Sequence, residues 1–87
     1  MNNWEIVFSN SSEIFIKKLK LKDIIARILK KIKELENGPF TLPYKKIAGV
    51  DNMYRIRIGN YRVTYEVDNE NRKIMILEIG HRQNIYD

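Results

Sequence analysis

The sequence predicts an α+β fold in which two helices pack on one face of a mainly antiparallel sheet. Three observations support this prediction. Residues 4–9 alternate and are rich in strand formers, apolar residues then recur at helical spacing, and short strand-like segments fill the second half. One strand, two helices and an antiparallel β-meander pack most simply with both helices on one sheet face, which leaves the other face open.

Size and composition predict one small domain covering residues 1–87, because 87 residues leave no room for a second. The absence of cysteine excludes disulfides and thiolate metal sites and fits a reducing compartment. No apolar run approaches the roughly 20 residues of a membrane span, and the N-terminus lacks a secretory pattern. We therefore expect a cytoplasmic protein without a membrane partner. The net charge of +5 favours a polyanionic ligand, above all nucleic acid.

The first helix is predicted to begin at Asn10, because Asn10 and Glu13 have capping-box spacing, and to run to about Lys20. Its inward residues are expected to be Ile14, Phe15 and Leu19. The second helix is predicted over residues 21–36 and is ended by the Asn-Gly-Pro sequence that follows. Its apolar stripe at 3.6-residue spacing consists of Ile24, Ile25, Ile28, Leu29, Ile32 and Leu35.

The second half is predicted to form a meander after a linking segment, residues 40–52, that carries Lys45 and Lys46. Residues 53–58 and 61–67 are expected to be strands, because the Gly-Asn pair between them is typical of tight hairpins. Residues 73–80 supply another strand after a turn at 68–72. The hairpin fixes a register in which Tyr54, Ile56, Ile58, Tyr61, Val63, Tyr65 and Val67 face the helices.

The opposite face then carries Met53, Arg55, Arg57, Arg62, Thr64 and Glu66, and Arg57 lies directly across from Arg62. Like charges in a cross-strand pair are destabilising, so an external anion is the simplest reason for this pair. The alternative is a surface salt-bridge ladder through Glu66 or Glu78. If Glu78 points away from the core, Leu77 and Ile79 point inward, and Arg82 shares the parity of Glu78. A register shift of one residue would reverse this.

Arginine suits phosphate because its planar fork binds two oxygens and keeps its charge. Several forks around one phosphate would stabilise the extra charge of a pentacoordinate transition state. Tyr86 would stack on a base or cover the sheet edge. Glycine-rich phosphate loops, zinc spacing and Ser/His/Asp sets are absent from the sequence, and His81 is its only histidine. Because the 11 carboxylates form no pair that we can place on the arginine side, we expect no metal or cofactor.

Two sequence runs resemble the RelE/ParE toxin superfamily. Residues 54–67, YRIRIGNYRVTYEV, are similar to the centre of these toxins, and residues 79–86, IGHRQNIY, to their end. Residues 45–49, KKIAG, look like the segment that precedes the central strands. Together with residues 4–9 and the two helices, the resemblance covers essentially the whole chain and favours the RelE-like mRNA interferase branch.

The resemblance implies a ribosome-dependent endoribonuclease that inhibits translation and is blocked by a separately encoded antitoxin in a hetero-oligomer. It implies attack by the RNA 2′-hydroxyl on the adjacent phosphate, without metal, leaving a 2′,3′-cyclic phosphate. The family's catalytic positions match Arg55, Arg57, Arg62, Arg82 and Tyr86. By the physics of the groups, Arg62 and Arg82 would hold the scissile phosphate, and Arg55 and Arg57 would add charge. Lys45, Lys46 and His81 are the expected contacts to RNA or ribosome.

The proton acceptor stays open, because some relatives carry lysines where this chain has Arg55 and Arg57, and arginine does not release its proton. His81, a lysine of the 45–46 pair, or positioning by the ribosome are the alternatives. A ParE-like toxin that poisons DNA gyrase without chemistry of its own is the second functional hypothesis. An inactivated relic and a plain RNA-binding module are the others, because fold alone does not fix function.

Overall fold

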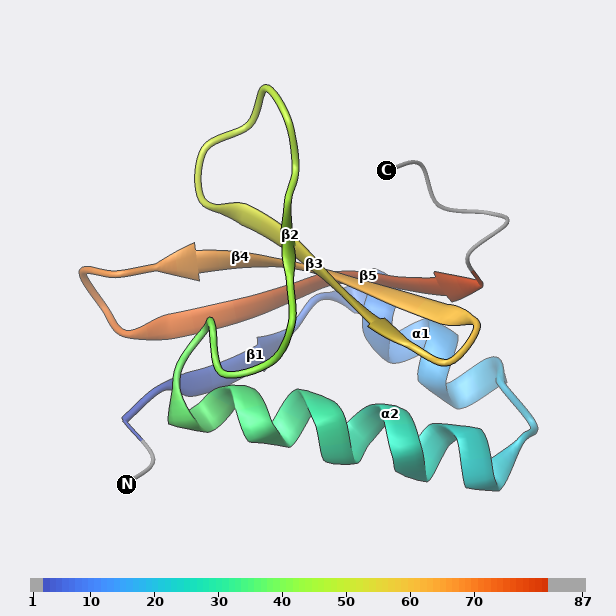
Figure 1. Cartoon of the computed structure of the whole chain (residues 1–87). Helices are drawn as coiled ribbons and strands as arrows, with labels where there is room; N and C mark the ends of the chain where they lie inside the picture. The colour runs from blue at the N-terminus through green and yellow to red at the C-terminus, as the bar shows by residue number, and fades with distance from the viewer. Residues whose placement is uncertain (1–2, 82–87) are drawn as a thin grey trace.

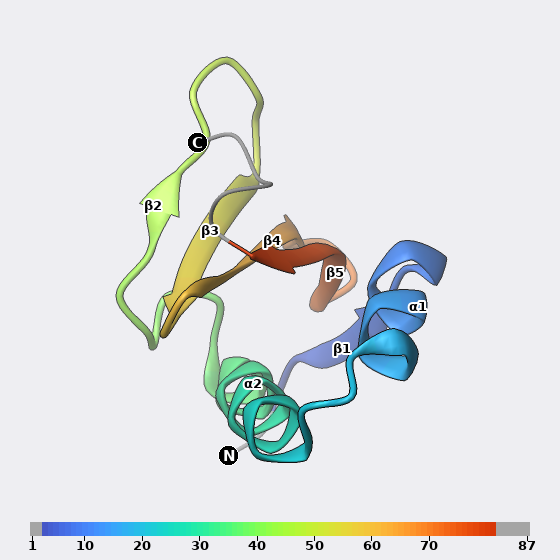
Figure 2. The ribbon, with the colours of Figure 1, turned by 90° about the vertical axis from the view of Figure 1, so that its right-hand side faces the viewer.

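The computed structural model describes residues 3–81, which form a five-stranded sheet with two helices on one side of it (Figure 1). The elements in chain order are β1 (Glu5–Phe8), α1 (Asn10–Lys18), α2 (Lys22–Glu34), the 3₁₀ turn η1 (Leu35–Asn37), β2 (Lys45–Lys46), β3 (Met53–Ile58), β4 (Tyr61–Asp68) and β5 (Lys73–His81). The strand order is β1-β5-β4-β3-β2. Seen from the side, α1 and α2 cover the same face (Figure 2). The predicted α+β class is confirmed.

The sheet is mixed because β1 runs parallel to β5, whereas every other neighbouring pair is antiparallel. A parallel pair cannot be joined by a tight turn and needs a long crossover connection. The helices begin that crossover, and β2, β3 and β4 complete it. The first and last strands therefore lie side by side, with Glu5 opposite Lys73 and Phe8 opposite Ile76.

The N-cap of helix α1 is Ser9, because the Ser9 Oγ accepts a hydrogen bond from the backbone N–H of Ser12 at 3.1 Å. The predicted capping role of Asn10 is therefore wrong. The residue fully buried on this helix is Ser12. Ile14 is 51% exposed, so its predicted inward position is wrong. Phe15 packs partly against the core, and so does Leu19 just past the helix end.

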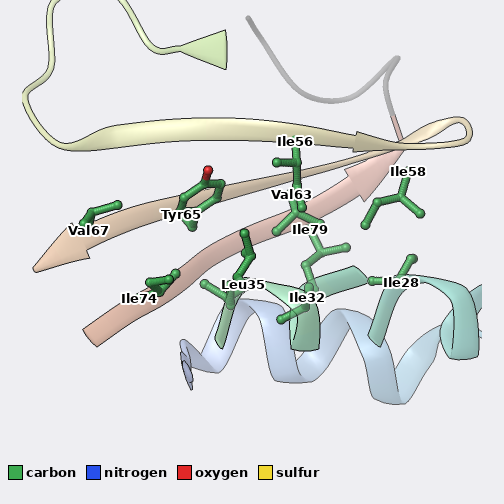
Figure 3. Packing of buried hydrophobic residues seen from close by; sticks show 11 residues of the cluster. Ile28, Ile32, Leu35, Ile56, Ile58, Val63, Tyr65, Val67, Ile74 and Ile79 are labelled. Atoms are coloured by element: carbon green, nitrogen blue, oxygen red, sulfur yellow. The ribbon is translucent and has the colours of Figure 1, made fainter. Parts of the chain in front are cut away.

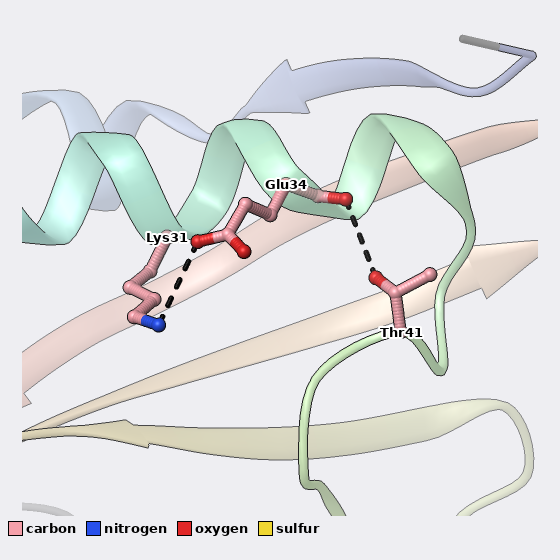
Figure 4. Close-up of polar contacts among 3 residues, drawn as sticks. All are labelled: Lys31, Glu34 and Thr41. Carbon is pink, nitrogen blue, oxygen red and sulfur yellow. Dashed lines mark hydrogen bonds and ion pairs between the residues drawn. The ribbon is translucent and has the colours of Figure 1, made fainter. Parts of the chain in front are cut away.

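Helix α2 keeps the predicted stripe only in part. Ile28, Ile32 and Leu35 are buried and Ile24 is partly so, but Leu29 is 38% exposed and not inward. The α-helix ends at Glu34, two residues earlier than predicted, and tightens into η1. Near its end, Lys31 Nζ lies 3.6 Å from a Glu34 carboxylate oxygen, and Thr41 Oγ1 donates to the Glu34 carbonyl oxygen at 3.3 Å (Figure 4).

The hydrophobic core lies between α2 and the inner sheet face (Figure 3). It confirms the predicted inward positions on the hairpin, since the buried members on β3 and β4 are Ile56, Ile58, Val63, Tyr65 and Val67. Full burial of such a side chain contributes roughly 1.5–3 kcal/mol each. Tyr65 also donates its hydroxyl to the Pro39 carbonyl oxygen at 2.6 Å, which ties the segment after η1 to the sheet.

Strand β5 departs from simple alternation. Thr64 pairs with Glu78, but its neighbour Tyr65 pairs with Ile76, so Leu77 is an extra residue in a β-bulge. The bulge switches the inward parity of β5: Ile74 and Ile76 face the core before it, and Ile79 after it. The predicted inward position of Leu77 is therefore wrong, whereas Ile79 inward and Glu78 outward are confirmed.

Residues 40–52 were predicted as a plain linking segment and contain the short edge strand β2. Lys45 pairs with Arg55 and Lys46 pairs with Tyr54. Two residues are too few to show a period of two, which is why the sequence pattern did not reveal this strand. The two pairs fix the sides on which the two lysines lie.

Candidate nucleic-acid interface

The β3–β4 hairpin has the predicted register. Gly59 has a φ of 60°, whereas Asn60 is not among the positive-φ residues, the pattern of a type II′ turn whose first central residue is glycine. Arg57 lies opposite Arg62 and Arg55 opposite Thr64. We call the side chains of Arg55, Arg57, Arg62 and Thr64 the arginine face. They lie on the side of the sheet away from the core.

The residues of the arginine face differ in their exposure to solvent. Arg55 is 7% exposed and Thr64 is 8% exposed, whereas Arg62 is half-buried and Arg57 is exposed. A guanidinium keeps its charge even where water is scarce. Arg55 is therefore a fixed positive charge within the sheet surface, and Arg57 and Arg62 carry two further charges toward solvent from adjoining strands.

Strand β5 borders this face with one carboxylate and one glycine. Gly80 lies opposite Arg62 and Glu78 lies opposite Thr64. Because Gly80 has no side chain, the β5 position beside Arg62 adds no group that competes for it. Within residues 3–81, no ion pair joins Glu66 or Glu78 to an arginine. The alternative, a salt-bridge ladder through Glu66 or Glu78, is therefore not present among the described residues.

The predicted lysine and histidine contacts are divided between the two faces. Lys45, opposite Arg55, lies on the side of the arginine face. Lys46 lies on the other side, where its Nζ donates to the Val50 carbonyl oxygen at 3.1 Å and lies 5.8 Å from the centre of the Tyr54 ring.

His81 is also on the core side. It pairs with Tyr61, and the two ring centres are 5.4 Å apart. Neither Lys46 nor His81 is brought to the arginines. Arg82 and Tyr86, predicted to complete the site, lie outside the described residues. Among residues 3–81, no group of three or more histidine, aspartate and glutamate side chains is placed to hold a metal ion.

The arrangement suits a single phosphodiester. Directly opposed residues on antiparallel strands have Cβ atoms only about 4.5–5.5 Å apart, so the side chains of Arg57 and Arg62 leave the sheet from neighbouring points. Each fork can bind two phosphate oxygens. The buried charge of Arg55 adds to the same positive field, and Thr64 adds a hydroxyl beside it.

Comparison with known proteins fits this geometry. The family described as the ParE toxin of type II toxin–antitoxin systems, parDE, matches residues 6–86. The chain belongs to the RelE/ParE superfamily. A curated relative, Toxin RelE3 of Methanocaldococcus jannaschii, is 40% identical over 75 residues, which cover 77% of this chain and 83% of the relative.

Solved structures place the chain in the RelE-like branch of the superfamily. The RelB–RelE antitoxin–toxin complex of Methanococcus jannaschii contains a chain that is 34% identical, with a TM-score of 0.73 and coverage of 93% of this chain and 95% of that one. The archaeal RelE–RelB complex of Pyrococcus horikoshii gives 26% identity, a TM-score of 0.78 and coverage of 98% and 100%. Within the described residues, no helix is both long and apolar enough to cross a membrane.

One feature of this RelE-like chain was not found from the sequence. A groove of about 480 Å³ runs along β3 beside the arginine face, lined by Lys31, Leu42, Pro43, Tyr44, Lys45, Arg55, Ile56, Arg57 and Ile58. The available signal was the presence of two aromatic residues, Phe40 and Tyr44, directly before Lys45 and Lys46.

Proposed function

We propose that this RelE-like toxin is an endoribonuclease that cuts mRNA in the ribosome, in the cytoplasm, by a reaction that needs no metal. The observation that carries the proposal is the direct opposition of Arg57 and Arg62 on the outer face of the sheet. The repulsion between the two arginines does not stabilise the fold. A phosphodiester bound between them would gain hydrogen bonds from both guanidinium groups.

In the proposed reaction the 2′-hydroxyl oxygen attacks the adjacent phosphorus, and the bond from phosphorus to the 5′-oxygen breaks. The phosphorus passes through a pentacoordinate state with added negative charge. Arg62 and Arg57 would bind its oxygens, and the buried Arg55 would strengthen the field at the same point. The products are a 2′,3′-cyclic phosphate and a 5′-oxygen that takes up a proton. Arg82 and Tyr86 remain part of the proposal as phosphate and base contacts.

For the proton acceptor, the structure supports Lys45 over His81 and Lys46, because only Lys45 lies on the side of the arginines. The Lys45→Arg variant separates two roles, since it keeps the charge but cannot take the proton. If Lys45 is the acceptor, this variant loses about a hundredfold or more in cleavage rate. A rate close to that of the unmodified protein would leave Lys45 as a phosphate contact and return the acceptor to the ribosome.

The endonuclease proposal is tested by adding the purified protein to a translating extract and mapping new mRNA 5′ ends. We expect cuts in phase with codons that disappear in Arg62→Ala. The matched control is Arg72→Ala, because Arg72 is an exposed arginine of the β4–β5 turn whose guanidinium lies 4.4 Å from the Trp4 ring centre. Intact mRNA with the unmodified protein would contradict the proposal.

The second candidate is poisoning of DNA gyrase, and the family description, ParE toxin, is the observation in its favour. A gyrase cleavage assay run beside the mRNA mapping separates the two. Gyrase-linked DNA breaks with intact mRNA would establish the second candidate. RNA binding with neither activity would indicate a binding module or an inactive relic.

We also propose that the chain binds a cognate antitoxin in a hetero-oligomer. Two solved neighbours are described as complexes of RelE with RelB. The charge of +5 on this chain favours an acidic partner. Co-expression with a short acidic reading frame next to its gene should yield a complex that survives purification and suppresses mRNA cleavage.

A further inference from the structure

We propose that the groove beside β3 binds one nucleotide of the RNA strand next to the scissile phosphate, with its base against Tyr44. This inference rests on the proposed function and adds a subsite to it. The groove is bounded on one side by residues 42–45 and on the other by the second half of β3, with Lys31 of α2 contributing at its border.

The groove is positively charged. Four of the nine residues that line it are cationic, namely Lys31, Lys45, Arg55 and Arg57, and none is acidic. The carboxylate of Glu34 lies 3.6 Å from the Lys31 Nζ, but both side chains are nearly half exposed. Exposed ion pairs are weak and are screened by salt. The groove therefore favours an anion such as a nucleotide phosphate.

The groove also has an aromatic wall that is held in place from behind. The Tyr44 side chain is 48% exposed, and its ring centre lies 4.8 Å from that of Phe40 and 5.5 Å from that of Tyr54. Packing against two rings limits the rotamers of Tyr44, so little side-chain entropy is left to lose on binding. A supported and partly exposed ring next to positive charge is the usual platform for a base of single-stranded nucleic acid.

The groove is continuous with the arginine face. Arg55 and Arg57 line the groove and belong to that face, and Lys45 lines the groove from the side of the arginines. A strand whose scissile phosphate is held by Arg57 and Arg62 can therefore place a neighbouring nucleotide in the groove without leaving the protein surface. The volume of about 480 Å³ is ample for one nucleotide.

The test uses the whole protein and a short single-stranded 2′-O-methyl oligonucleotide, which the proposed reaction cannot cleave. Affinity is measured at low salt for the intact oligonucleotide and for versions with one base removed at successive positions. We expect base removal at one position to weaken binding by roughly fivefold to a hundredfold. In Tyr44→Ala that position should lose its sensitivity, whereas Tyr44→Trp should keep it.

Two controls keep the result interpretable. Ile14→Ala removes an exposed apolar side chain of α1 that does not line the groove, and it should preserve the sensitive position. Thermal unfolding of each variant establishes that it is folded. If Arg62→Ala weakens binding but Tyr44→Ala leaves the whole base-removal pattern unchanged, the groove inference fails and the proposed function stands.

Two other outcomes also overturn the inference. If the unmodified protein binds no oligonucleotide at all, the groove inference and the proposed function fail together. If Tyr44→Ala leaves oligonucleotide binding intact but abolishes binding of a poly-glutamate peptide, the groove is a docking site for an acidic protein.

Discussion

At the scale of single residues, the arginine face places repulsive charge where the fold gains nothing from it. Arg57 and Arg62 are directly opposed, and Arg55, in the adjoining row, is 7% exposed. Like charges at opposed positions destabilise a sheet by roughly 0.2–1 kcal/mol. Function and stability should therefore respond in opposite directions at these positions.

The Arg57→Gln variant tests this opposition. We expect its free energy of unfolding to rise by a few tenths of a kcal/mol, because the repulsion with Arg62 is removed. Its mRNA cleavage should fall. Denaturant unfolding and 5′-end mapping on the same preparation measure the two effects. A loss of stability in Arg57→Gln would mean that the arginine pair is structural.

On the core side of the sheet, the buried Tyr65 makes a hydrogen bond that stabilises the fold. Its hydroxyl donates to the Pro39 carbonyl oxygen at 2.6 Å, and burial, followed by the nearby Tyr44 and Tyr54, raises the pKa of Tyr65 above its ordinary value. Tyr65→Phe leaves that buried carbonyl without its donor, so we expect a loss of about 1–3 kcal/mol in the free energy of unfolding.

The raised pKa of Tyr65 also predicts a dependence on alkaline pH. The stabilisation is complete below the pKa of the unfolded chain, about 10. It is lost as the pH rises further, because the unfolded tyrosine then ionises while the folded one stays neutral. Urea titrations at rising pH should show this decline in the unmodified protein and a smaller one in Tyr65→Phe. Equal declines in both proteins would contradict the assignment.

At the scale of elements, the start of α1 and the bulge in β5 are held by the same two serines. Ser9 Oγ accepts from the Ser12 backbone N–H and donates to the carbonyl oxygen of the bulge residue, Leu77, at 2.8 Å. The buried Ser12 Oγ lies 3.2 Å from the Ile76 carbonyl oxygen. These hydrogen bonds to Leu77 and Ile76 stabilise the β5 bulge, which puts Glu78 on the outer side of the sheet.

Ser9→Ala and Ser12→Ala should each lower the free energy of unfolding by about 1–2 kcal/mol, because each removes a cap or a buried hydrogen bond to β5. The double variant should lose less than the sum, since the two hydroxyls share partners. Ser11→Ala is the matched control, because Ser11 is exposed in the same turn and should change stability little. Equal losses in all three single variants would contradict this role of Ser9 and Ser12.

The elements also show how far the sequence could be read. The Gly59-Asn60 turn set the β3–β4 register, so the opposition of Arg57 and Arg62 was predictable. The β5 bulge was not, because it breaks the alternation from which inward positions are inferred, and Leu77 was misplaced as a result. Strand β2 has only two residues and carries no periodic signal. The groove therefore appeared only when β2 was seen beside β3.

At the scale of the whole molecule, the net charge of +5 indicates a binding surface only when the positions of the basic residues are known. The fold places Lys45 and three arginines on the outer side of the sheet, and leaves Lys46 and His81 on the core side. The sequence predicted membership of the RelE/ParE superfamily and a common face for the three arginines, but it did not show on which side Lys45, Lys46 and His81 lie. Strand pairing supplied that information.

The central claim, that one phosphodiester is held between arginines of β3 and β4, is tested most directly by arginine side-chain NMR. The Nε–Hε signals of isotope-labelled protein are followed during titration with a non-cleavable 2′-O-methyl oligonucleotide. We predict that Arg57 and Arg62 shift together with one binding constant, while Arg72, whose guanidinium lies 4.4 Å from the Trp4 ring centre, stays unchanged. A shift at Arg72 that equals or exceeds those at Arg57 and Arg62 would contradict the claim.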